Sequence, residues 1–347
     1  MKMKQLLKRT LALLLAVLTM ATAVSAANKS GYSDVPDKHW AASSIAQCKQ
    51  YDLLQGVGNG KFGLGQKMTR AAYASALCRL MGWKTVTPQK GSFSDNQDTK
   101  KWYYSAVETA AAHDVFPGHS TTCRPNDAVT REEMAAMTMR ALGYSTLSGT
   151  VQDECPFTDV TTNPGYITLA WRMGLVTGMA AKTFSPKKDT TREQAAAVLL
   201  RAYHAKNAKV TVSTVSTLPD GAVLAESLIG ESGSVPLSPR AAVEQVYDAA
   251  VKAGKGGSVT LNAVPVAQNT KNGKSTTPRT ITQEELAGYL ADSAVQKSRS
   301  GRFDSSYLLI KEKEGSVTTV WYESETDIAE KTELCKLLGV KTVYILK

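Results

Sequence analysis

A Thr-Arg pair stands at the head of an apolar, helix-like segment three times in this chain, at a constant interval of 61 residues. The three pairs are Thr69-Arg70, Thr130-Arg131 and Thr191-Arg192. A fixed interval of this length is the signature of a repeat architecture, in which one unit cannot bury its apolar face alone. We therefore expect three copies of one helical unit to pack around a common core.

The three units share one order of parts. Each opens on an aromatic-Ser/Thr-Asp sequence, which predicts a cap or a turn at the Asp, and a first helix of about three turns follows. We expect that helix to end at a Gly in the left-handed conformation and a loop with a buried anchor residue to follow. The Asp residues are Asp34, Asp95 and Asp159, the Gly residues are Gly56, Gly118 and Gly178, and the anchors are Phe62, Cys123 and Phe184.

The second helix of each unit is expected to begin at the Thr of the pair. Glu133 and Gln194 follow their Thr by three residues and complete a capping box in the second and third units. The first unit has Ala72 at this position, so its Thr has no reciprocal partner. The predicted buried stripe of these helices contains Leu77, Met139 and Leu199.

The Arg of each pair is not explained by capping. A cation in the first turn lies against the positive end of the helix dipole, where an acidic side chain is favoured by about 0.3–1 kcal/mol. A carboxylate or phosphate held by free helix amides and the guanidinium would account for Arg70, Arg131 and Arg192 together. The alternative is that the Glu that follows in two units neutralises the Arg locally. We favour anion binding.

Aromatic residues are expected near the same site. Trp40 and Trp102 lie at the start of the first helices, and Tyr166 is assigned to this role in the third unit. An aromatic face beside charged groups suits the apolar face of a sugar ring, whereas a Trp on a short helix otherwise belongs to the core. Both interpretations stay open.

These features together resemble S-layer homology domains in tandem triplicate, over about half of the chain. The resemblance implies a mainly α, pseudo-threefold helical bundle whose grooves bind secondary cell-wall polysaccharide attached to peptidoglycan, commonly bearing pyruvyl ketals. It implies polysaccharide-binding roles for Arg70, Arg131, Arg192, Asp34, Asp95, Asp159, Trp40, Trp102, Tyr166, Gly56, Gly118 and Gly178. Ala72, Tyr166 and the loop Phe116-Pro117-Gly118 depart from the family pattern, so we expect unequal grooves.

The first 26 residues predict a secretory signal peptide. Four Lys and Arg side chains precede an uncharged apolar run at 11–23, and Val24-Ser25-Ala26 supplies small residues for cleavage. An uncleaved anchor helix is the alternative, but this run is shorter than the roughly 20 residues that span a bilayer. We expect a protein secreted to the cell wall or S-layer, without a membrane segment after cleavage.

The net charge and the cysteine content restrict the classes of ligand and cofactor that the sequence predicts. The net charge of +10 falls to about +6 without the signal, which suits an anionic polymer at the cell surface better than nucleic acid. The five Cys form no CxxC pair, so neither a metal site nor a cofactor is predicted. We expect buried free thiols, with a Cys48–Cys78 bridge as the alternative.

The sequence after the repeats changes in composition and predicts a smaller α/β region. Expected there are a helix at 239–254, a strand at 258–264, a polar loop at 268–280, a helix at 282–295 capped by Thr282 and Glu285, and a final strand, strand, helix, strand series. The expected divisions are a signal peptide at 1–26, repeats at 30–84, 91–145 and 155–205, a linker at 206–236 containing a short strand, and the α/β region at 237–347.

The C-terminal tail also resembles the last βαβ segment of family 18 glycoside hydrolases, at Val320-Trp321-Tyr322-Glu323 and Gly339-Val340. The resemblance covers about 30 residues and lacks the catalytic signature of that family, and the region is too short for a (β/α)₈ barrel. We expect Glu323, Glu325 and Asp327 to be solvated and the protein not to be an enzyme. The alternatives are a wall-associated glycoside hydrolase and a structural S-layer subunit that self-associates through this region.

Overall fold

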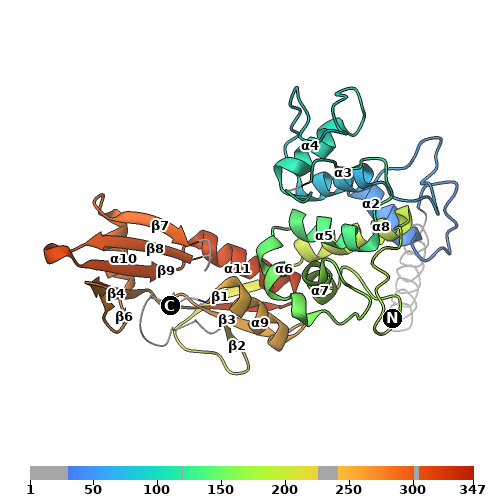
Figure 1. Ribbon diagram of the computed structural model, residues 1–347. Coiled ribbons are helices and arrows are strands. Elements are labelled where there is room, and N and C mark those ends of the chain that lie inside the picture. Colours follow the sequence, from blue (N-terminus) through green and yellow to red (C-terminus); the bar gives the residue numbers. More distant parts are fainter. Residues whose placement is uncertain (1–29, 119, 226–240, 301–304) are drawn as a thin grey trace, which may run out of the picture. The chain divides into compact units, whose positions relative to one another are not determined.

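The computed structural model describes residues 30–118, 120–225, 241–300 and 305–347. The chain divides into two compact units, Met1–Tyr203 and His204–Lys347 (Figure 1). The signal peptide predicted at 1–26 lies outside the described residues. Within the described ranges, no helix has the length and apolar character that crossing a membrane requires.

The N-terminal unit is helical, as predicted, and each repeat contributes a first and a second helix (Figure 1). Helix α6 (Ser145–Thr150) and the 3₁₀ helix η1 (Gln152–Glu154) connect the second and third repeats. The first helices are α2 (Ala42–Gln50), α4 (Tyr104–Ala112) and α7 (Pro164–Arg172), and the second helices are α3 (Arg70–Met81), α5 (Arg131–Ala141) and α8 (Arg192–Lys206).

Small residues occupy an equivalent buried position in the three second helices. Ala74, Ala135 and Ala196 are the fifth residues of α3, α5 and α8, and all three are fully buried. Side chains at a helix contact set the distance between helix axes, so Ala permits a close approach. The predicted stripe is confirmed, since Leu77, Met139 and Leu199 are also fully buried.

A ring of three backbone hydrogen bonds joins the segments that precede the second helices. The amide of Met68 donates to the carbonyl of Thr190 (2.8 Å), and the amide of Thr190 donates to the carbonyl of Val129 (2.9 Å). The amide of Val129 closes the ring on the carbonyl of Met68 (2.8 Å). Each repeat therefore contacts both others, unlike the repeats of a solenoid, which contact only their neighbours in sequence.

The prediction that Gly56, Gly118 and Gly178 end the first helices is wrong. The helices end earlier, at Gln50, Ala112 and Arg172. The left-handed residue lies four positions before each expected Gly, at Asp52 (φ 53°), Asp114 (φ 56°) and Gly174 (φ 71°). Asp can adopt this conformation, which is why a search for Gly alone misplaced the cap.

The C-terminal unit contains two sheets. A parallel sheet of order β1-β10-β3-β2 is accompanied by α9 (Val243–Ala253) and α11 (Glu325–Leu337). Its strands are β1 (Thr211–Val215), β2 (Val223–Ala225), β3 (Ser258–Asn262) and β10 (Thr342–Leu346). The antiparallel sheet contains β4 (Val266–Lys271), β5 (Lys274–Ser275), β6 (Arg279–Thr280), β7 (Gln296–Ser300), β8 (Ser305–Lys311) and β9 (Val317–Tyr322), with the 3₁₀ helix η2 (Lys313–Gly315) between the last two.

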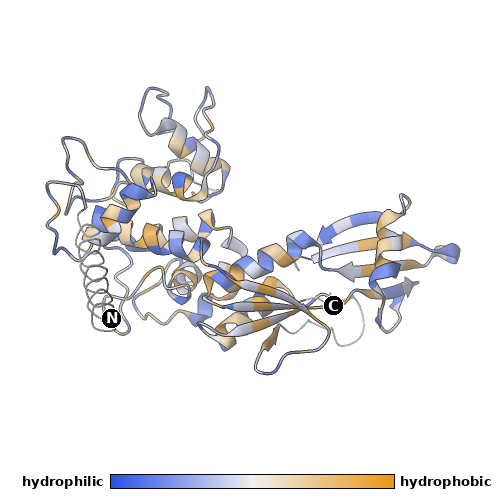
Figure 2. Cartoon of the chain, turned by 180° about the vertical axis from the view of Figure 1, so that it is seen from behind, coloured by the Kyte–Doolittle hydropathy of each residue, from blue (hydrophilic) through white to orange (hydrophobic). Residues whose placement is uncertain are grey.

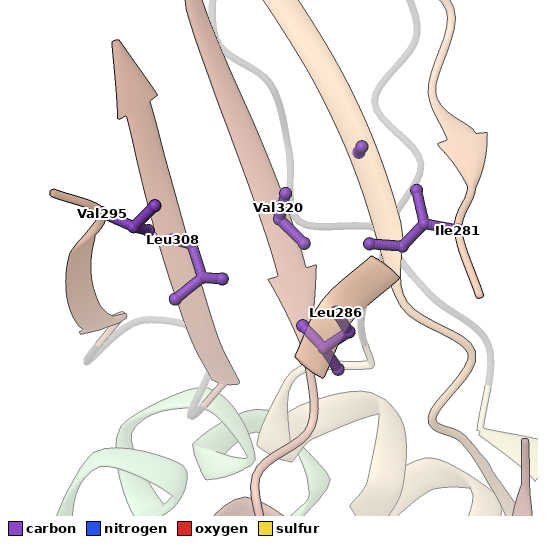
Figure 3. Packing of buried hydrophobic residues seen from close by; sticks show 6 residues of the cluster. Ile281, Leu286, Val295, Leu308 and Val320 are labelled. Atoms are coloured by element: carbon purple, nitrogen blue, oxygen red, sulfur yellow. The ribbon is translucent and has the colours of Figure 1, made fainter. Parts of the chain in front are cut away.

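One apolar cluster supports the antiparallel sheet. Leu308 of β8 and Val320 of β9 are fully buried and pack with Leu286 of α10 (Gln283–Ala291), Ile281 and Val295 (Figure 3). The predicted capping box of Thr282 and Glu285 begins α10. Along the helices of both units, hydrophobic and hydrophilic residues are interleaved, as expected for elements with one buried face (Figure 2).

Two predictions for this unit need correction. The expected linker contains two strands where one short strand was predicted: β1 pairs with β10 along its whole length, and β2 pairs with β3. The polar loop expected at 268–280 is a hairpin, in which β4 and β5 flank Asn272 (φ 52°) and Gly273 (φ 74°). Asn-Gly is the preferred sequence of a two-residue hairpin turn, so this signal was present and overlooked.

Candidate functional site

The Arg of each Thr-Arg pair is buried at a junction between repeats. Arg70 is 5% exposed, and Arg131 and Arg192 are each 8% exposed. Each Nε donates to the carbonyl of the loop anchor in the next repeat, in cyclic order. These bonds run from Arg70 to Cys123 (2.7 Å), from Arg131 to Phe184 (2.8 Å) and from Arg192 to Phe62 (2.9 Å).

An aromatic ring lies beneath each guanidinium, which adds a cation–π contact. Arg131 and Arg192 lie over the anchor rings of Phe184 and Phe62, at 4.4 and 5.0 Å. The anchor of the second repeat is Cys123, and Arg70 lies over Phe116 instead, at 5.6 Å. Burial lowers the pKa of all three guanidinium groups, yet Arg remains a cation in proteins.

The helix amides beside these Arg residues are not free, so that part of the anion-site prediction is wrong. The amides of Arg70, Arg131 and Arg192 donate to the carbonyls of Asp127, Lys188 and Gln66 in the next repeat. Buried amides need such partners, and the neighbouring loop supplies them. Of these three residues, only the guanidinium groups remain as candidate anion ligands.

The Thr residues cap the helices to different extents. Thr69 accepts from the amide of Ala72 without a reciprocal bond, as expected, and Thr130 forms a full box with Glu133. Gln194 reaches back to the amide of Thr191 (3.1 Å), but the Thr191 hydroxyl is buried without a hydrogen-bond partner in the described structure. The third box is therefore only half formed.

The opening Asp residues lie in turns and hold the anchor loops rather than capping a helix. Asp159 accepts from the amides of Phe184 and Ser185, both at 2.8 Å. These hydrogen bonds lower the pKa of Asp159. For Asp34 and Asp95, burial raises the pKa, but equivalent hydrogen bonds outweigh it and the net pKa is lowered. The Asp residues thus orient the carbonyls to which the Arg residues bond.

Close backbone approach requires Gly at two of the three equivalent positions of the repeats. A Cβ on Gly56 would lie 2.3 Å from the carbonyl oxygen of Lys61, and one on Gly178 would lie 2.7 Å from that of Ala180. A Cβ on Gly118 would meet nothing within 4 Å. The loop of the second repeat is therefore more open, in agreement with its atypical Pro117.

The aromatic predictions have mixed outcomes. Trp40 and Trp102 are 62% and 69% exposed, so the interpretation that they belong to the core is wrong. They lie two residues before α2 and α4, and the third repeat has Thr162 at this place. Assigning Tyr166 to the Trp position is therefore wrong by four residues. Tyr166 instead lies under the guanidinium of Arg140, at 4.6 Å.

A hollow of about 190 Å³ lies at the Arg70 junction. Glu133 joins Arg70 (2.9 Å) to Arg124 there, and Glu132 is bound by Lys187 and Thr162, both at 2.6 Å. Neither Arg124 nor Arg140 was predicted to be a site residue. The residues that line this hollow include Arg70, Pro117, Arg124, Glu132, Glu133 and Arg140.

Acidic residues at the start of α11 were expected to be solvated, and for two of them this is wrong. Glu323 is buried and pairs with the Lys331 ammonium at 2.6 Å, and Ser305 donates to the same carboxylate oxygen. Asp327 is fully buried and accepts from Arg299 and Ser306. Glu325 is exposed, as expected.

The five cysteines are free, as predicted, and no Cys48–Cys78 bridge forms. Cys48, Cys123 and Cys335 are buried as expected, whereas Cys78 and Cys155 are only half-buried. Cys48 is buried and donates to the carbonyl of Ala196. Burial raises the pKa of Cys48, Cys123 and Cys335 to about 12 in each case. These thiols stay protonated at neutral pH, and we assign them to packing.

Comparison with known proteins identifies the repeats. The model of the S-layer homology domain matches residues 31–74, 92–135 and 156–196. An amylopullulanase of Thermoanaerobacterium thermosulfurigenes is 30% identical over 48% of this chain and 9% of its own length. An S-layer protein of Bacillus thuringiensis subsp. finitimus is 29% identical over 50% of this chain and 21% of its own length. The chain thus spans a small part of these relatives.

Solved structures give a weaker similarity. The spore cortex-lytic enzyme SleL of Bacillus cereus is 13% identical, with a TM-score of 0.28 over 42% of this chain and 34% of that chain. The corresponding enzyme of Bacillus megaterium is 14% identical, with a TM-score of 0.28 over 62% and 42% of the two chains. Similarity of this size supports no conclusion about the fold or activity of the C-terminal unit.

Proposed function

We propose that the chain is a secreted cell-surface protein anchored by its three tandem S-layer homology domains, and that these domains bind an anionic, pyruvylated secondary polysaccharide of the cell wall. The binding is non-covalent and uses the grooves at the junctions between repeats. The observation that carries the proposal is the recurrence of a buried guanidinium at all three junctions. A pyruvyl ketal presents one carboxylate on a sugar ring, and a guanidinium suits a carboxylate.

Exposed aromatic residues support the sugar part of the proposal. The indole rings of Trp40 and Trp102 are open to solvent at the starts of α2 and α4. Large aromatic side chains usually bury most of their surface, so two exposed Trp at equivalent positions indicate a surface used in binding. Their flat faces fit the apolar face of a sugar.

The proposal is tested by sedimentation of the mature chain with wall sacculi, before and after hydrofluoric acid removes the secondary polymer. We expect co-sedimentation only before this treatment. Binding that survives removal of the polymer would contradict the proposal.

Substitution separates groove binding from general adhesion. Trp40→Ala with Trp102→Ala should weaken sedimentation about tenfold, since one or two aromatic contacts of about 0.5–1.5 kcal/mol are lost. Leu218→Ala, at a 49% exposed apolar residue of the C-terminal unit, is the matched control and should bind as the parent does. Equal binding by all three chains would argue against the assigned surface.

We assign no catalytic activity to the C-terminal unit. Glu323 pairs with the buried Lys331, and Asp327 accepts from Arg299 and from the hydroxyl group of Ser306, which supports a structural role for both carboxylates. Release of reducing sugar from chitin or wall oligosaccharides would favour the glycoside hydrolase alternative. Formation of ordered arrays by the purified chain would favour a self-associating S-layer subunit.

A further inference from the structure

The second hydrogen bond of each junction Arg differs between the repeats. Nη2 of Arg131 donates to the carbonyl of Thr177 (2.6 Å), and Nη2 of Arg192 donates to that of Gln55 (2.5 Å). These carbonyls immediately precede Gly178 and Gly56. Arg70 contacts the carboxylate of Glu133 instead, at 2.9 Å. One junction therefore contains an ion pair where the other two contain neutral carbonyls.

The residue responsible is the third residue of the second helix in the next repeat. In the second repeat it is Glu133, which is only partly exposed and also contacts Arg124. The equivalent residues are Gln194, in the repeat that follows Arg131, and Ala72, in the repeat that follows Arg192. Neither carries a charge. In the described part of the chain, no carboxylate forms an ion pair with Arg131 or Arg192.

The groups that an entering anion meets therefore differ between the junctions. At Arg70 a carboxylate already occupies the guanidinium, although Arg70, Arg124 and Glu133 together keep the charge of one cation. A guanidinium bound to carbonyls keeps its full positive charge. Asp159 acts on Arg131 through longer-range attraction, as do Tyr32, Asp34 and Glu193 on Arg192. Arg70 shares its charge with Glu133 in a half-buried setting, where ion pairs are screened less than at the surface. An entering carboxylate would have to displace or approach Glu133.

We propose that Glu133 weakens the Arg70 groove for carboxylate-bearing sugars, and that the Arg131 and Arg192 grooves carry most of the wall binding. This inference rests on the proposed function. It adds which grooves bind the polymer and names Glu133 as the residue that makes the grooves differ. The hollow at Arg70 does not make this groove the stronger anion site, because its lining contains Glu132 and Glu133 beside the cations.

The test exchanges the deciding residue without removing the helix cap. Glu133→Gln introduces the residue of the third repeat, which still reaches back to the amide of its capping Thr. Gln194→Glu makes the reverse change beside Arg131. Glu285→Gln is the matched control, since Glu285 holds the same capping-box position in α10 of the other unit.

Binding is measured by isothermal titration of the mature chain with a 4,6-O-pyruvyl ketal of a methyl hexoside, and with its uncharged methyl ester. We expect E133Q to raise affinity or stoichiometry for the acid by up to about tenfold, Q194E to lower affinity by a similar factor, and E285Q to match the parent. The ester should show neither change.

The proposal is overturned if E133Q binds the acid with the affinity and stoichiometry of the parent. In that case a parent chain that binds the acid still supports the proposed function. A parent chain that binds neither the acid nor wall sacculi overturns both.

Discussion

Both units of this chain contain buried cations, but the charges of Arg192 in one unit and Lys331 in the other are compensated differently. Arg192 in the N-terminal unit donates to the carbonyls of Phe62 and Gln55. Lys331 in the C-terminal unit is 2% exposed and pairs with the carboxylate of Glu323 at 2.6 Å. A cation bound by carbonyls keeps its net charge, whereas a cation paired with a carboxylate forms a neutral unit. The first arrangement can attract an anion, and the second serves the fold.

The comparison also shows that burial of a charge does not by itself indicate a functional site. Burying an ion costs several kcal/mol, which must be offset by partners that remain in place. Lys331 and Glu323 offset this cost for each other by forming an ion pair. At Arg131 and Arg192, hydrogen bonds to backbone carbonyls offset this cost. The positive charge of these two guanidinium groups is then available to a ligand.

The largest expected effect comes from breaking the neutral pair. Lys331→Met should destabilise the C-terminal unit by about 3–5 kcal/mol, because Glu323 would be left buried beside an apolar side chain. Hydrogen exchange of β8 and β9 in the full mature chain measures this. The double variant Lys331→Met with Glu323→Gln should recover much of the loss. A double variant as unstable as the single one would show that the charge pairing is not the cause.

A smaller effect is expected for the cation held by carbonyls. Arg192→Met leaves the carbonyls of Phe62 and Gln55 without this donor, which should cost about 1–3 kcal/mol. Urea denaturation followed by circular dichroism of the helical unit measures it. Arg192→Lys should recover only part, since an ammonium lacks the fork that reaches both carbonyls. Full recovery by Lys would mean that charge, and not the shape of the guanidinium, matters here.

The smallest effect concerns the Asp residues that orient those carbonyls. Because the pKa of Asp159 is lowered in the folded chain, its contribution is complete above the unfolded pKa of about 4 and is lost as pH falls through the folded value. Asp159→Asn should therefore cost about 1 kcal/mol or less at pH 7 and flatten the acid-side loss of stability. Thermal unfolding between pH 7 and pH 3 measures both. An unchanged acid profile would show that Asp159 does not contribute to it.

Much of the helical unit was predictable because local rules are enough. The interval of the Thr-Arg pairs predicted three repeats, and the capping boxes at Thr130 and Thr282 formed as expected. The buried anchors Phe62, Cys123 and Phe184 were also predicted correctly. Errors arose where a rule was applied too narrowly, as with the left-handed Asp52 and the hairpin at Asn272.

The candidate site was harder to predict, since its partners come from different repeats. From the sequence, neutralisation of an Arg by the Glu beside it was the alternative to anion binding. In the structure Glu133 does neutralise an Arg, but it is Arg70 of the preceding repeat rather than its neighbour Arg131. Parallel pairing of β1 with β10, more than 120 residues away, was equally invisible to local patterns.

The sequence by itself determined the number of repeats, the helices and their caps, and the choice of Arg at each junction, because these depend on residues close together in the chain. Only the tertiary structure decided where each Arg points. The ring of repeats places every guanidinium against a loop carbonyl of the next repeat. The next repeat adds the Glu133 carboxylate of α5 at Arg70, and a second loop carbonyl at Arg131 and at Arg192. The charge left for a ligand is therefore a property of the junction and not of the motif.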